Sequence, residues 1–133
     1  HTMVASDAVP PASYERKVAP KGAGTSARIL GQYLRAEGLL SLSDAIARLS
    51  LYPAQRMEAI APAFARKGRV SIGVDADIVV FDPGTVAAMA SYAAPFNPPT
   101  GIHSVWVAGV LAVQGGELVD GVGSGQKLTS ATP

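Results

Sequence analysis

The sequence predicts an α+β chain in which helices come first and short strands follow. Apolar residues recur at helical spacing between residues 25 and 58, and they alternate with polar residues after Pro62. The composition, with 48% hydrophobic and 16% charged residues, is too apolar for a disordered chain. At 133 residues the chain is long enough to bury a core, and a single domain is the default expectation from length alone.

The first part of the chain is expected to be a strand followed by a long loop. Residues 2–6 form a short apolar run closed by Asp7, which fits a strand that ends at an acidic residue. Prolines and glycines then break any regular period between residues 8 and 24.

Three helices are predicted next. The first covers residues 25–38, with Thr or Ser as the cap and Gly38 placed to end it. Ser41 is the expected N-cap of the second helix, and Asp44 follows three positions later in an arrangement like a capping box. The third helix covers residues 53–58, with a proline in its first turn.

The remainder of the chain is expected to be strands joined by glycine turns. A long connection is expected over residues 84–101, between the strands at residues 76–81 and 104–107. A helical turn is predicted in it around residues 86–89. A Gly-, Ser- and Thr-rich tail begins at residue 121. The predicted strands cover residues 69–72, 76–81, 104–107, 110–113 and 117–119.

Charge and residue counts exclude several classes of function. Eleven basic and ten acidic residues give a net charge of +1, which predicts neither a nucleic-acid partner nor a membrane surface. There is no apolar run of membrane length. The chain has no cysteine, so disulfides, thiolate zinc sites and cysteine nucleophiles are excluded. Its two histidines, His1 and His103, cannot build a multi-histidine metal site.

Three further charged residues are given no functional role. Asp75 is expected in a turn and Asp77 at the entry to a strand, both bonded to local backbone, with a cation site as the alternative. Arg35 is interpreted as a solvated surface charge.

Several segments resemble the C-terminal end of enzymes of the amidohydrolase superfamily. Residues 68–82 read GRVSIGVDADIVVFD and residues 101–110 read GIHSVWVAGV. Residues 24–46, GTSARILGQYLRAEGLLSLSDAI, are similar to the branch of N-acyl-D-amino-acid deacylases, the D-aminoacylases. Residues 4–7, VASD, resemble that branch's S-D-[GA] step. The resemblance extends from residue 2 to about residue 128.

The resemblance implies a metal-dependent (β/α)8 TIM barrel with a small β-sandwich built from both chain ends. Residues 1–62 would be the C-terminal end of the barrel, comprising its eighth strand, a loop and helices. Residues 63–128 would form most of the β-sandwich, and residues 129–133 a tail. The start at residue 1 would then be a break within an enzyme.

The resemblance also implies a catalytic role for Asp7. In this superfamily the aspartate at the end of the eighth barrel strand takes a proton from the metal-bound water, and Asp7 stands at that position. Barrel active sites lie at the carboxyl ends of strands, which agrees with an aspartate that closes an apolar run. Asp7 could also ligate the metal, expected to be one or two zinc ions held mostly by residues outside this chain. The alternative is a strand-end aspartate that accepts backbone hydrogen bonds.

Lys21 is the second candidate site residue. The deacylase branch usually has His-Pro-Arg where this chain reads Ala19, Pro20 and Lys21, and the basic residue of that motif meets the substrate carboxylate. Lys21 is therefore expected to contact the substrate, although lysine keeps the charge of arginine without its two-pronged fit. The alternative is a solvated loop lysine.

Taken together, the resemblance predicts hydrolysis of the amide bond of N-acyl-D-amino acids or related small amides. The expected partner is the remaining N-terminal barrel polypeptide, the expected location is the cytoplasm, and the 133-residue chain alone is expected to be inactive. The alternative is a non-catalytic β-sandwich module that serves structure or interaction, or one chain of a split or nicked amidohydrolase.

Overall fold

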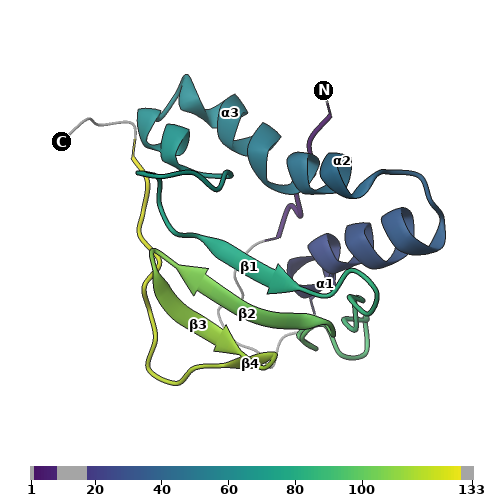
Figure 1. The fold of residues 1–133 in the computed structure, drawn as a ribbon. Coiled ribbons are helices and arrows are strands. Elements are labelled where there is room, and N and C mark those ends of the chain that lie inside the picture. Colours follow the sequence, from purple (N-terminus) through teal and green to yellow (C-terminus); the bar gives the residue numbers. More distant parts are fainter. Residues whose placement is uncertain (1, 9–17, 130–133) are drawn as a thin grey trace. The chain divides into compact units, whose positions relative to one another are not determined.

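The structure, a computed structural model, describes residues 2–8 and 18–129 (Figure 1). Contacts between residues divide the chain into two compact units, each assembled from segments that lie far apart in the sequence. Unit 1 comprises residues 1–4, 46–80 and 103–133, and unit 2 comprises residues 5–45 and 81–102. No helix in the described part is long and apolar enough to cross a membrane.

The helices form two runs. α1 continues directly into the wider π-helical turns of η1, and α2, η2 and α3 follow one another without a break before the short 3-10 helix η3. The bounds are α1 Lys21–Arg28, η1 Ile29–Ala36, α2 Leu42–Ile46, η2 Ala47–Leu51, α3 Tyr52–Glu58 and η3 Pro62–Arg66.

Three of the five predicted helix boundaries are confirmed. The start predicted at residue 53 is instead a continuation of the second run, since η2 passes into α3 at Tyr52 without a break. Gly38 ends the first run with a φ of +64°, a left-handed conformation that glycine adopts without steric cost. Ser41 caps the second run: its Oγ accepts the Asp44 N–H at 3.1 Å and donates to Asp44 Oδ2 at 2.7 Å. The last α-turn ends at Glu58, as expected. The first helix, however, begins at Lys21 and not at residue 25.

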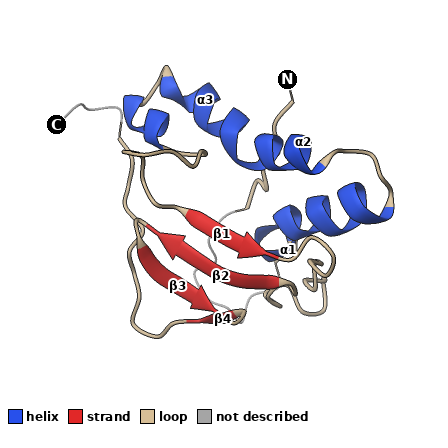
Figure 2. Cartoon of the chain, viewed as in Figure 1, coloured by secondary structure: helices blue, strands red, loops and turns tan. Residues whose placement is uncertain are grey.

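The strands form one four-stranded sheet in the order β1-β2-β3-β4, with neighbouring arrows running in opposite directions (Figure 2). Antiparallel pairing places Val107 opposite Val110 across the Ala108–Gly109 turn, and a bulge lies at Val105/Trp106. The last four predicted strands are thereby confirmed. Their bounds are β1 Ile78–Phe81, β2 Ile102–Val107, β3 Val110–Gln114 and β4 Glu117–Leu118.

Two predicted strands are absent from the described residues. Residues 2–6 form no ladder; Val4 donates its N–H to the Arg48 carbonyl at 2.9 Å, and Arg48 donates to the Thr2 carbonyl at 3.1 Å. Residues 69–72 also form no strand, and their apolar side chains, Val70 and Ile72, are exposed. Apolar alternation predicts a strand, but a strand forms only where another backbone pairs with it.

The predicted helical turn at residues 86–89 is also wrong. Val86 donates its N–H to the Asp82 carbonyl, and Ala87 forms an isolated antiparallel bridge with Thr100. Residues 83–85 thus form a turn and residues 86–90 follow it without helical structure, so that residues 83–90 make a strap that is part of unit 2.

The strap packs against the first helical run through two glycines. Val86 is fully buried, and a Cβ built on Gly31 would lie 2.5 Å from the Val86 carbonyl oxygen. A Cβ on Gly24 would lie 3.5 Å from the Ala90 Cβ, an ordinary contact. Arg35 donates to the carbonyls of Val86, at 2.7 Å, and Pro83, at 3.1 Å. The interpretation of Arg35 as a solvated charge is therefore wrong, because it binds the backbone of the strap.

The two glycines should respond to alanine in opposite ways. We expect Gly31→Ala to lower the free energy of unfolding by about 1–3 kcal/mol, because the new methyl group meets backbone that cannot yield cheaply. Gly24→Ala should raise it by about 0.5–1 kcal/mol through lower unfolded-chain entropy. Urea denaturation measures both, and shifts of the same sign would contradict this packing.

The cap of the second helical run gives a further prediction. Ser41→Ala should lower the free energy of unfolding by about 1 kcal/mol, because the Asp44 N–H loses its acceptor. Ser43→Ala is the matched control, since the Ser43 hydroxyl contacts the Ser41 hydroxyl. Equal losses in the two variants, measured by urea denaturation, would show that Ser41 is not the cap.

Candidate functional site

Asp7 and Lys21, the two site residues predicted from the sequence, lie together in unit 2. Lys21 Nζ donates to Asp7 Oδ2 at 2.7 Å across a separation of 14 residues. The Asp7 side chain is 92% exposed and that of Lys21 is 42% exposed, so the pair lies at the surface of this chain.

The N-terminus of α1 positions Lys21. Pro20 precedes it at the N-cap, and the Thr25 hydroxyl donates to the Lys21 carbonyl oxygen at 2.8 Å. Gly24 and Ala27 are the buried residues of the same helix. Lys21 is thus attached to a rigid element, which limits where its ammonium can reach.

Asp7 lies in a segment that has no regular structure. Its φ of +51° is in the left-handed region, which aspartate tolerates better than most residues. The turn is held locally, because the Ala8 N–H donates to the Ser6 hydroxyl at 3.3 Å. The result is a carboxylate presented to solvent at a turn.

The ammonium group favours the ionised form of this carboxylate. The hydrogen bond from Lys21, together with its positive charge, holds the pKa of Asp7 below the usual aspartate value. An ordinary aspartate is already ionised at neutral pH, and Asp7 is so too. It is one oxygen donor only: the described residues contain no group of three or more His, Cys, Asp or Glu that could hold a metal.

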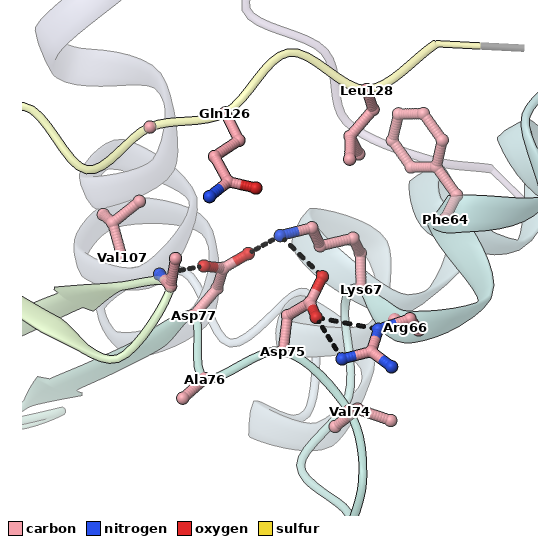
Figure 3. A pocket seen from close by; sticks show the side chains of 12 residues that line it. Phe64, Arg66, Lys67, Val74, Asp75, Ala76, Asp77, Val107, Gln126 and Leu128 are labelled. Atoms are coloured by element: carbon pink, nitrogen blue, oxygen red, sulfur yellow. Dashed lines mark hydrogen bonds and ion pairs between the residues drawn. The ribbon is translucent and has the colours of Figure 1, made fainter. Parts of the chain in front are cut away.

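A cavity of about 650 Å³ lies elsewhere, within unit 1 (Figure 3). The lining charges pair with one another: Lys67 Nζ lies 3.0 Å from Asp75 Oδ2 and 2.6 Å from Asp77 Oδ2. Arg66 also binds Asp75, at 2.7 Å. Gln126 of the C-terminal segment lines the cavity across from Lys67.

This network explains the spacing of the aspartates. The expectation that both aspartates bond local backbone is wrong: Asp77 Oδ1 accepts the Ala108 N–H at 2.8 Å from 31 residues away, and Asp75 pairs with the side chains of Arg66 and Lys67. The cation that both carboxylates meet is the Lys67 ammonium. Sequence reasoning assigned no role to Lys67, because its acceptors lie eight and ten residues further along the chain and no local pattern links them. The network joins the end of η3 to the sheet.

The network should make stability depend on acid in a defined direction. Lys67 holds the pKa of Asp77 below its usual value, and Arg66 does the same for Asp75. Their contribution is complete above the ordinary carboxyl pKa of about 3.9, and it is lost as the pH falls through the lowered values. Asp77 in turn raises the pKa of Lys67, whose contribution is complete below the ordinary lysine pKa and is lost as the pH rises through the raised value.

Asp77→Asn tests this assignment, because the amide oxygen can still accept the Ala108 N–H while the charge is gone. We expect lower stability at pH 7 and a shallower loss of stability as the pH falls below about 4, measured by urea denaturation at each pH. Asp120→Asn, at an exposed carboxylate, is the control. An acid slope equal to that of the unsubstituted chain would rule out the ion pair with Lys67.

Solved structures identify the class of protein. A crystal structure of D-aminoacylase, described as defining a novel subset of amidohydrolases, matches with a TM-score of 0.75 and 34% identity over 85% of this chain and 23% of that one. N-acyl-D-glutamate deacylase from Bordetella bronchiseptica, complexed with zinc and a phosphonate inhibitor, matches with a TM-score of 0.66 and 36% identity over 72% and 19%. The chain is therefore homologous to part of an amidohydrolase.

Curated relatives narrow the class to one branch. D-aminoacylase of Alcaligenes xylosoxydans xylosoxydans is 38% identical over 81% of this chain and 21% of its own length. N-acyl-D-glutamate deacylase of the same organism is 36% identical over 80% and 20%. No family model matches the chain. The predicted relationship to the N-acyl-D-amino-acid deacylases is confirmed, and the chain spans about a fifth of the length of the curated relatives it matches.

Proposed function

We propose that this chain is the C-terminal part of a zinc-dependent amidohydrolase that hydrolyses N-acyl-D-amino acids or related small amides. The observation that carries the proposal is its similarity to three deacylases of this kind, together with its span of about a fifth of their length. Residues 1–62 would complete a barrel and residues 63–128 would contribute to a β-sandwich, with the rest of both supplied by other polypeptide.

The metal of such an enzyme requires ligands from outside this chain. Relatives carry a binuclear metal centre in one structure and zinc in another. The described residues contribute at most the Asp7 carboxylate, because they hold no cluster of three ligating side chains. Bound zinc would polarise the amide carbonyl and acidify the attacking water.

Asp7 supplies the proton transfers of this reaction. Its ionised carboxylate accepts a proton from the water whose oxygen bonds to the amide carbon. When the carbon–nitrogen bond breaks, Asp7 returns that proton to the departing amine, so the products are a carboxylic acid and a free amino acid. Asp7 is ionised at neutral pH, as this role requires, and the lowering of its pKa by Lys21 makes its carboxylate a weaker base than an isolated aspartate.

A second candidate is an interaction module, including one chain of a split or nicked enzyme. The observation in its favour is the exposure of apolar side chains in unit 1, where Val70 is 86% exposed and Ile72 is fully exposed. Contiguous exposed apolar surface marks interaction sites. A denaturing gel with metal analysis separates the cases: a larger companion polypeptide with one or two zinc ions indicates a split enzyme, and a single metal-free species indicates a module.

Asp7→Asn in the complete enzyme tests the proposed chemistry. We expect kcat for N-acetyl-D-amino acids to fall by about 10²–10⁴-fold, because the amide of asparagine cannot accept the proton. Initial-rate kinetics with N-acetyl-D-glutamate measure the loss, and zinc content by elemental analysis shows whether the metal is retained. Asp120→Asn is the control and should leave kcat unchanged. Full activity in Asp7→Asn would remove Asp7 from the mechanism, and hydrolysis by the 133-residue chain alone would contradict the proposed division of the enzyme.

A further inference from the structure

We infer that Arg48 is a positioning residue for Asp7, because it holds residues 2–4, the segment from which the chain runs to Asp7. The inference rests on the proposed function of Asp7. The observation that carries it is a pair of hydrogen bonds within unit 1. Arg48 Nη1 donates to the Thr2 carbonyl at 3.1 Å, and the Val4 N–H donates to the Arg48 carbonyl at 2.9 Å.

These two bonds, the Arg48 clamp, hold the segment at two points. Thr2 and Val4 are two residues apart, and both bonds end on the same residue. A single bond would leave the segment free to pivot, whereas two bonds also fix its direction. Residues 2–4 belong to no strand ladder, so the clamp satisfies backbone groups that strand pairing would otherwise satisfy.

Arg48 is suited to this role because its side chain is packed. The residue lies in η2, in the middle of the continuous helical run formed by α2, η2 and α3. It is partly buried, and its Nε atom is buried without a hydrogen-bond acceptor among the described residues. A guanidinium shielded from water binds its acceptor more strongly than an exposed one. The segment is therefore attached to a helical run by a group that does not move freely in solvent.

The restraint passes to Asp7 along the backbone. The chain leaves unit 1 after Val4, and Asp7 follows three residues later. Three residues span at most about 11 Å even when fully extended, so the clamp limits where Asp7 can lie. The turn at Asp7 shortens this connection further, because the Ala8 N–H donates to the Ser6 hydroxyl. A catalytic carboxylate needs such a restraint, since a displacement of about 1 Å is enough to slow a reaction.

Hydrogen exchange in the complete enzyme tests the clamp itself. In Arg48→Met, which keeps the length of the side chain and removes its donors, we expect the Val4 amide to exchange about 3–10-fold faster, because the segment then opens more readily. Arg48→Lys keeps a donor and should stay within twofold of the unsubstituted enzyme. Arg56→Met is the matched control, at an exposed arginine of α3 in the same helical run.

Two results of this experiment would overturn the inference. Unchanged exchange over residues 2–4 in Arg48→Met would show that the guanidinium does not hold the segment. An equal rise in the amides of β2 and β3 would show a general loss of stability in place of a local one.

The consequence for catalysis is measured by the division of the effect between kcat and KM with N-acetyl-D-glutamate. For Arg48→Met we expect kcat to fall about 3–10-fold with KM changed less than twofold, because a misplaced base slows the chemical step without weakening binding. Arg48→Lys should recover most of the loss, and Arg56→Met should leave both constants unchanged. A rise in KM with kcat unchanged would overturn the inference.

Asp7→Asn separates the failure of this inference from that of the proposed function. Full activity in Asp7→Asn would refute the proposed function of Asp7. An inactive Asp7→Asn enzyme together with an unaltered kcat in Arg48→Met would leave that function standing and overturn the inference about Arg48 alone.

Discussion

The close approach of the strap at residues 83–90 to the first helical run is the constraint on which unit 2 depends. Gly31 permits it, because any side chain there would collide with the Val86 carbonyl. Arg35 then satisfies that carbonyl and the one at Pro83, so the buried backbone keeps its hydrogen bonds. The approach fixes the axis of α1, and the first residue of α1 is Lys21. The position of the candidate site therefore depends on the helical run that begins at Lys21 and packs against the strap at Gly31.

Unit 1 is held together in part by ion pairs, whereas unit 2 depends on small residues that allow close packing. Lys67, at the end of η3, bridges two aspartates that precede β1, and one of these also holds the turn between β2 and β3. The charges around the cavity are paired with one another, so its lining offers a ligand no uncompensated charge. This structural role accounts for Asp75 and Asp77 in the segment 68–82.

Sequence alone predicted the elements whose signals are local. Caps, glycine stops and strands joined by tight turns depend on neighbours within a few residues, and Gly38, Ser41 and the strands from β1 to β4 confirm this. The failures depend on distant partners. Residues 2–6 and 69–72 have strand-like patterns with no backbone to pair with in the described chain.

The candidate site was likewise predicted from the sequence only in part. The resemblance identified Asp7 and Lys21 separately, because each stands at a recognisable motif position. Their contact with each other could not be predicted, since it depends on where the chain returns after 14 residues. For Arg35 and Lys67 the sequence showed only exposed-looking charge, and their acceptors come from the strap and from the approach to β1.

The interleaving of the two units has a consequence for the order of folding. Unit 1 draws on residues near the beginning, the middle and the end of the chain, while unit 2 takes the intervening stretches. Neither unit is a continuous piece of polypeptide: unit 2 is complete once residue 102 has been made, whereas unit 1 also needs the residues of β2 and β3. The helices can form early from local contacts, but the core of unit 1 closes only after the C-terminal strands have been made. During that interval the apolar surfaces of the nascent chain remain open to chaperones.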